Sequence, residues 1–152
     1  MIIAIVFFIF LVIYLFSSGS AQKDPKKYQN TAYGFELTYP YSKKESRDKV
    51  VFFGRFRSQI FSISYFPEQN IQSVIDAWKK RGEYRDSPKV FEGDVKLQKC
   101  TSRQISLGTE QKKYSYYFIS FGRNTVLLDA RGMISETTRE DTQEILNSFT
   151  CL

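Results

Sequence analysis

Histidine is absent from this chain, and only two of its 152 residues are cysteine. The absence of histidine excludes Ser-His-Asp and Cys-His catalysis and every imidazole ligand for a metal. The two cysteines, Cys100 and Cys151, are too far apart in the sequence to form a CxxC motif or a thiolate cluster. The sequence therefore predicts no metal site, and it lacks the residues of the commonest nucleophilic active sites.

Motifs that bind nucleotides or nucleic acids are also missing. The glycines form neither a GxGxxG fingerprint nor a Walker A loop. No zinc-finger, KH or RNP signature occurs, although the net charge is +6. Glu136, Glu140 and Glu144 have the spacing of a solvated helix face, not of a glycosidase carboxylate pair. We therefore expect no cofactor, no specific nucleic-acid partner and no catalysis of these kinds.

Charge is absent from the first 21 residues, where an apolar run extends from Ile2 to Phe16. Such a run does not remain in water, so it enters a bilayer, is removed after export or packs on a partner. Together with the uncharged residues 17–21 it spans about 30 Å as a helix. It also fits a signal-peptide core, followed by small residues and a cleavage site between Ala21 and Gln22. We assign residues 1–21 as a signal peptide or a membrane anchor.

The charges around the apolar run conflict with export. No Lys or Arg precedes it, and Lys23, Lys26 and Lys27 follow it, so the positive-inside rule alone would keep the next segment in the cytoplasm. The segment has neither a cysteine for lipid attachment nor the early Glu of a type IV pilin. We nevertheless expect a membrane-anchored or secreted chain with an extracytoplasmic domain, because of its cysteine pair and the family resemblance described below.

The charged remainder divides into a short polar stretch and one domain. Residues 22–30, with three lysines and one proline, predict a flexible tether, and residues 31–152 have the length of a single domain. Alternation of apolar and polar residues predicts strands at Tyr33–Tyr39 and Gln59–Phe66. Runs rich in apolar or aromatic residues predict further strands, among them Val50–Phe56, Lys113–Phe121 and Thr125–Arg131. The polar segment Tyr41–Lys49 is expected to be a loop.

Two helices complete the pattern. An apolar stripe from Ile71 to Trp78 follows Asn70 as N-cap and predicts a helix that ends before Gly82 as its C′ residue. A Thr137-x-x-Glu140 capping box opens the last helix. Strands joined by short turns form antiparallel sheets. The expected fold is α+β, an antiparallel sheet of about six to seven strands covered by two helices (an α/β/α sandwich) and preceded by the N-terminal apolar helix.

The remaining candidate residues are cysteines and lysines. In an oxidising compartment Cys100 and Cys151 are expected to form one disulfide, and two separate buried thiols are the alternative. Basic residues beyond a membrane segment favour anionic head groups. The candidate contacts for such a surface are Lys23, Lys26, Lys27, Lys43 and Lys44.

The element order, with YGFELTYP at residues 33–40 and EILNSFTCL at residues 144–152, resembles the Mog/PsbP-like α/β/α sandwich family. The resemblance covers roughly Thr31 to Leu152 and departs from the pattern at Tyr41, near which a tryptophan is usual. It implies a small bacterial exported or membrane-anchored member that binds a protein partner or stabilises an assembly. It assigns no catalytic residue, because the matching positions are fold residues.

Together these features predict a non-catalytic extracytoplasmic binding or accessory module with an unidentified protein partner, held to or exported across the membrane by its N-terminal segment. Two alternatives stay open. One is a basic cell-envelope protein that binds anionic lipid or polymer, and the other is an unrecognised hydrolase. A pocket of convergent polar groups around a perturbed carboxylate would favour the hydrolase.

Overall fold

The computed structural model of this chain describes residues 22–109 and 111–152, so the leader predicted over residues 1–21 lies outside the described residues. The strands of the described part are β1 (Lys26–Asn30), β2 (Phe35–Tyr39), β3 (Ser42–Glu45), β4 (Lys49–Phe53), β5 (Gln59–Phe66), β6 (Lys89–Leu97), β7 (Cys100–Gly108), β8 (Lys113–Phe121), β9 (Asn124–Ala130) and β10 (Thr150–Cys151). Its helices are α2 (Ile71–Lys79), α3 (Gly82–Asp86), the 3-10 turn η1 (Arg131–Ile134) and α4 (Glu136–Ser148).

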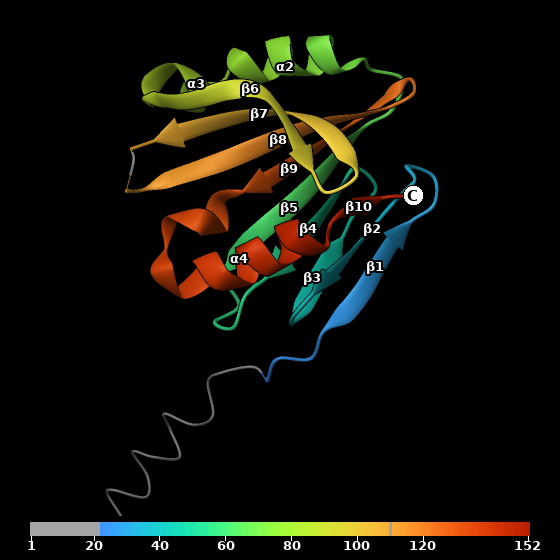
Figure 1. The fold of residues 1–152 in the computed structure, drawn as a ribbon, viewed down its shortest axis with the longest axis vertical. Coiled ribbons are helices and arrows are strands. Elements are labelled where there is room, and N and C mark those ends of the chain that lie inside the picture. The colour runs from blue at the N-terminus through green and yellow to red at the C-terminus, as the bar shows by residue number, and fades with distance from the viewer. Residues whose placement is uncertain (1–21, 110) are drawn as a thin grey trace, which may run out of the picture.

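Two antiparallel sheets organise these elements. The larger has seven strands in the order β3-β4-β5-β9-β8-β7-β6, and the smaller has three in the order β1-β2-β10. Helices α2 and α3 cover one face of the larger sheet, whereas α4 and the smaller sheet lie on the other face (Figure 1). The predicted α+β fold, with an antiparallel sheet covered by two main helices, is confirmed. The second sheet, which shares a layer with α4, was not expected.

The aromatic strand β8 shows why both faces of the large sheet need a covering layer. Tyr116 and Phe118 point to one face and pack with Trp78 of α2, at ring-centroid distances of 4.5 Å and 5.6 Å. Tyr117 and Ile119 point to the opposite face and join the other hydrophobic cluster. A strand that is apolar on both sides is stable only between two layers. The tryptophan is therefore part of the core, with 2% of its surface exposed.

The segment expected to be a flexible tether is folded from Lys26 onward. Residues 26–30 form β1, which pairs with β2, and Tyr28 of β1 is buried. The Tyr28 hydroxyl donates to Glu45 Oε1 at 2.9 Å and lies 2.9 Å from the Tyr65 hydroxyl. Burial raises the pKa of Tyr28, so this phenol stays protonated. Tyr28 thus fastens β1 to β3 and β5, and the folded part begins before residue 31.

Three local expectations are corrected by the structure. Part of the predicted loop Tyr41–Lys49 forms β3, a polar edge strand that pairs with β4. Asn70 does cap α2, accepting from the Ser73 N–H at 2.9 Å, but Gly82 begins α3 instead of ending α2. Helix α4 begins at Glu136 after Ser135, and no capping-box hydrogen bond forms at its start. The predicted signals at Gly82 and at Thr137-x-x-Glu140 therefore do not mark the ends of these helices. Signals of this kind locate a helix end only to within one or two residues.

Candidate functional site

A polar cleft lies where the described chain begins, at residues 22 and 23. Figure 1 draws the blue start of the described chain at one end of the molecule, close to α4. Helix α4, the loop between β4 and β5, and the first described residues form the walls of the cleft. Its volume is about 580 Å³, and its lining residues are Gln22, Lys23, Tyr41, Arg55, Thr137, Glu140 and Asp141. Four separate segments of the sequence meet here, so the cleft exists only in the folded chain.

Asp141 is the buried acid of this cleft. It lies on the inner face of α4 with 7% of its surface exposed, and its Oδ1 is 3.9 Å from Lys23 Nζ. Burial raises the pKa of Asp141, while Lys23 and the backbone of Arg55 oppose that rise by favouring the ionised form. A carboxyl that is buried yet open to a cleft, with a raised pKa, is typical of functional sites. Such a carboxyl is also typical of a structural ion pair with a neighbouring basic side chain.

Asp141 should make the stability of the fold depend on pH. Its pKa is raised above the ordinary 3.8, so in the range just above pH 3.8 the native state holds more protons than the unfolded state. The free energy of unfolding contributed by this group therefore falls as pH rises through that range. In Asp141→Asn this slope disappears, as measured by urea unfolding of the full chain at pH 4 and pH 7. Glu136→Gln, at an exposed acid of the same helix outside this cleft, is the matched control; if its pH profile and that of Asp141→Asn coincide, the assignment is wrong.

Lys23 holds the start of the described chain against α4. Its Nζ lies 2.7 Å from Glu144 Oε2, and this hydrogen bond raises the pKa of Lys23. The lysines proposed as anionic-surface contacts thus include one that is already engaged with two carboxylates. The pairings of the other members are Lys26 with Asp24 at 3.4 Å, Lys27 with Glu36 at 2.7 Å, and Lys43 with Glu45.

Lys26 and Lys27 lie on β1, and Lys43 and Lys44 lie on β3. Tyr28 links the two strands, because its hydroxyl donates to Glu45 and Lys43 Nζ lies 4.9 Å from the centre of its ring. Lys44 is exposed on β3 and has no ion pair among residues 22–109 and 111–152. Since four of the five lysines face a carboxylate, their attraction to an anionic surface is largely offset. Contact with an anionic surface stays a prediction for these five lysines.

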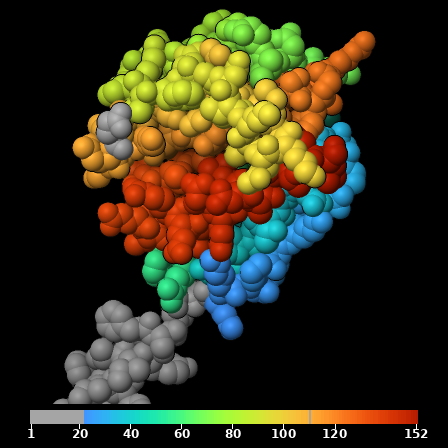
Figure 2. Space-filling view, in the orientation of Figure 1, coloured from blue at the N-terminus to red at the C-terminus, as the bar shows by residue number. Residues whose placement is uncertain are grey.

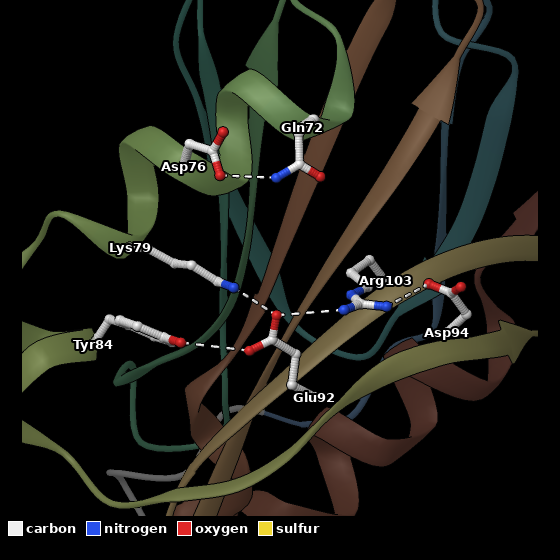
Figure 3. A network of polar contacts seen from close by, with 7 residues as sticks. All are labelled: Gln72, Asp76, Lys79, Tyr84, Glu92, Asp94 and Arg103. Atoms are coloured by element: carbon white, nitrogen blue, oxygen red, sulfur yellow. Dashed lines mark hydrogen bonds and ion pairs between the residues drawn. The ribbon is translucent and has the colours of Figure 1, made fainter.

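A second polar group joins α2 and α3 to the sheet edge (Figure 3). Glu92 of β6 accepts from Lys79 of α2 and from the Tyr84 hydroxyl at 3.4 Å, and it pairs with Arg103 of β7 at 3.4 Å. Lys79 holds the pKa of Glu92 below its usual range, and Arg103 contributes in the same direction. Arg103 also reaches Asp94 at 3.3 Å. These half-exposed pairs orient the helix layer, and each adds little stability.

A third group lies under α3. The Tyr116 hydroxyl donates to Glu83 Oε1 at 2.6 Å, and burial raises the pKa of this tyrosine. Arg131 of η1 donates to Asp129 Oδ2 from Nη2 at 2.6 Å and from Nε at 2.9 Å. The Asp129 hydrogen bond raises the pKa of Arg131. Every charge of this group has a counter-charge, and the arrangement ties α3 and η1 to the end of the sheet.

The predicted cysteine pair is joined. Cys100 and Cys151 form a disulfide with a Cα–Cα distance of 5.5 Å, which fastens the two-residue strand β10 to the start of β7. No cluster of three or more potential metal ligands occurs among the described residues. Within the same part of the chain, no helix has the length and apolarity needed to cross a membrane. Ile2, Phe16 and Ala21 lie outside the described residues, and Gln22 lines the cleft.

Asp141 was missed by the sequence analysis, which considered only the glutamates of α4. One signal was available, because Asp141 precedes Ile145 by four positions and therefore falls on the apolar edge of that helix. An acid on the buried stripe of a helix needs a partner. The partners, Lys23 and the Arg55 backbone, come from distant segments that periodicity does not connect.

No protein-family model matches the sequence, and no curated protein matches it. The solution structure of cyanobacterial PsbP (CyanoP) from Synechocystis sp. PCC 6803 matches with a TM-score of 0.56 and 11% identity, covering 86% of this chain and 94% of that chain. The fold is PsbP-like.

The PsbP-like fold confirms one half of the resemblance stated from the sequence, and nothing among these matches supports the Mog half. A crystal structure of a protein from Bacteroides thetaiotaomicron VPI-5482 also matches, at 13% identity and a TM-score of 0.49, covering 84% of this chain and 48% of that one. At 11% identity the likeness to CyanoP describes the arrangement of strands and helices and carries no residue role to this chain.

Proposed function

We propose that this protein is a non-catalytic binding or accessory module that stands outside the cytoplasm and is held at, or exported across, a membrane by residues 1–21. The observation that carries the proposal is the disulfide between Cys100 and Cys151 in a PsbP-like domain behind an uncharged apolar leader. Disulfides persist in oxidising compartments. A leader of this composition supplies the route to such a compartment.

The accessory role rests on the fold and on the state of the charged groups. Among residues 22–109 and 111–152, the buried and half-buried acids Glu36, Glu83, Asp129 and Asp141 each lie within 3.9 Å of a basic side chain. Such ion pairs connect elements within the domain, and the outer surface is left to contact a partner. Capture of the full chain from native envelope, with cross-links mapped to its surface residues, would identify that protein partner.

The two alternatives gain unequal support. The raised pKa of Asp141 in a cleft is the specific observation that favours a hydrolase, but Lys23 and the Arg55 backbone already occupy this carboxylate. Turnover of a general ester, glycoside or phosphate substrate that Asp141→Asn abolishes would establish the hydrolase instead. Binding of anionic polymer loses support, because most of the lysines nominated for it are paired with acids.

Lysine labelling tests the placement of the domain. Residues 1–21 contain no lysine, so every labelled lysine reports on the domain that follows. We expect a membrane-impermeant amine reagent to label lysine peptides of the full chain in intact, sealed bacterial spheroplasts. A cytoplasmic protein in the same cells is the control for leakage. If the lysines react only after the membrane is permeabilised, the domain lies on the cytoplasmic side and the proposal fails.

A further inference from the structure

The loop between β4 and β5, residues 54–58, forms a tight projection. The Gly54 N–H donates to the Ser58 carbonyl at 2.9 Å, and the Arg57 N–H donates to the Gly54 carbonyl at 2.9 Å. Arg57 adopts a left-handed conformation with φ of 58°, which turns the chain back toward β5. These contacts fix the backbone, so residues 55–57 are presented at a defined place on the surface.

Phe56 at the tip of this loop is an exposed aromatic residue between two arginines. It has 61% of its surface exposed, and the Arg55 guanidinium lies over its ring, 6.0 Å from the centroid. Arg57, which follows Phe56 in the sequence, is also exposed. An apolar ring flanked by cations matches the boundary between head groups and acyl chains, where the ring is buried and guanidinium groups contact phosphate. The sequence Arg-Phe-Arg therefore suits a lipid interface better than open water.

The position of the loop connects it with the leader. Arg55 lines the same cleft as Gln22 and Lys23, so the loop stands beside the point where residues 1–21 join the domain. Figure 2 shows the green-teal loop and the blue start of the described chain at the same end of the molecule. Phe91, the other exposed phenylalanine among the described residues, has 42% of its surface accessible. It belongs to β6, a strand that Figure 1 draws toward the opposite end of the molecule.

We propose that Phe56, with Arg55 and Arg57, inserts into the head-group region of the membrane that holds the leader, and so orients the domain with its cleft end toward the lipid. This inference rests on the membrane attachment proposed above. Two acids of α4, Asp141 of the cleft wall and Glu144, pair with Lys23. Lipid phosphate is the chemical group that Arg57 would meet at the tip.

Quenching of an introduced tryptophan by brominated lipid tests the contact. The full chain carrying Phe56→Trp is reconstituted in vesicles of phosphatidylcholine and phosphatidylglycerol, with or without brominated acyl chains. The native Trp78 is buried, with 2% of its surface exposed, and supplies a constant background. We expect loss of most of the added emission at position 56 in brominated vesicles. Phe91→Trp, the matched control, should keep its emission.

The outcomes separate this inference from the proposed function. If the chain floats with vesicles but Trp at position 56 is not quenched, or is quenched no more than Trp at position 91, the orientation is wrong while membrane attachment stands. If the chain does not float with vesicles at all, attachment and orientation both fail. Arg57→Glu in the Phe56→Trp background should weaken the quenching; unchanged quenching would remove the role given to phosphate.

Discussion

Removal of the disulfide should lower the free energy of unfolding by about 4 kcal/mol, the loss expected when a closed loop of this length is opened in the unfolded chain. The bond joins residues 51 positions apart, and it holds a final strand of two residues that pairs only with β2. Urea unfolding of wild type and Cys100→Ser measures the loss. The midpoint of thermal unfolding should fall by roughly 10 to 20 °C.

The controls for this prediction are other ways to remove the same disulfide. Cys151→Ser should give the same loss as Cys100→Ser, and the double variant should lose no more than either single variant, because each change removes the same bond. A reducing agent should destabilise wild type by a similar amount and leave the double variant unchanged. A wild-type midpoint that does not move on reduction would show that the bond contributes nothing to the fold.

Replacement of Phe35 by alanine should cost about 3–5 kcal/mol, the range for removing a large buried aromatic side chain. Phe35 is fully buried in β2, and its ring lies 5.0 Å from that of Phe149 and 6.0 Å from that of Phe121. It therefore joins the small sheet, the end of α4 and the large sheet. Phe56→Ala is the matched control and should change stability by less than about 0.5 kcal/mol, because Phe56 is exposed.

The Phe35 result also tests the reading of the motif at residues 33–40 as a fold motif. Equal losses in Phe35→Ala and Phe56→Ala would mean that the small sheet contributes little to the domain. A large loss confined to Phe35 would instead show that the aromatic-Gly-Phe opening is needed for packing. The motif shared with the PsbP-like family would then reflect a common fold, as the structural likeness to CyanoP does.

The long strands rich in apolar and aromatic residues were predicted closely from the sequence. Gln59–Phe66 and Lys113–Phe121 have the same bounds in the structure, because their apolar side chains are buried on covered faces. The short strands β1 and β3 were not predicted. They are edge strands in which Tyr28 is the one fully buried side chain, so their backbone pairing, not their side-chain pattern, makes them strands.

The arrangement of strands and the cleft depend on contacts that no local pattern encodes. The neighbouring strands Lys113–Phe121 and Thr125–Arg131 were both predicted, but β9 also pairs with β5, more than fifty positions earlier in the sequence. The Asp141 cleft likewise needs residues 22–23, Tyr41, the β4–β5 loop and α4 to meet. The disulfide could be predicted from the sequence, because two cysteines can form only one bond within the chain.

The redox state of the full chain in living cells tests the central claim most directly, since the claim is that a disulfide-bonded domain stands outside the cytoplasm. Free thiols are blocked in intact bacterial cells, the protein is denatured, and a maleimide-linked polymer is added before and after reduction. We predict that Cys100 and Cys151 react only after reduction, and that the protein sediments with membranes or is exported. Two thiols that are already free in the cell, in a chain recovered from the cytosol, would contradict the account.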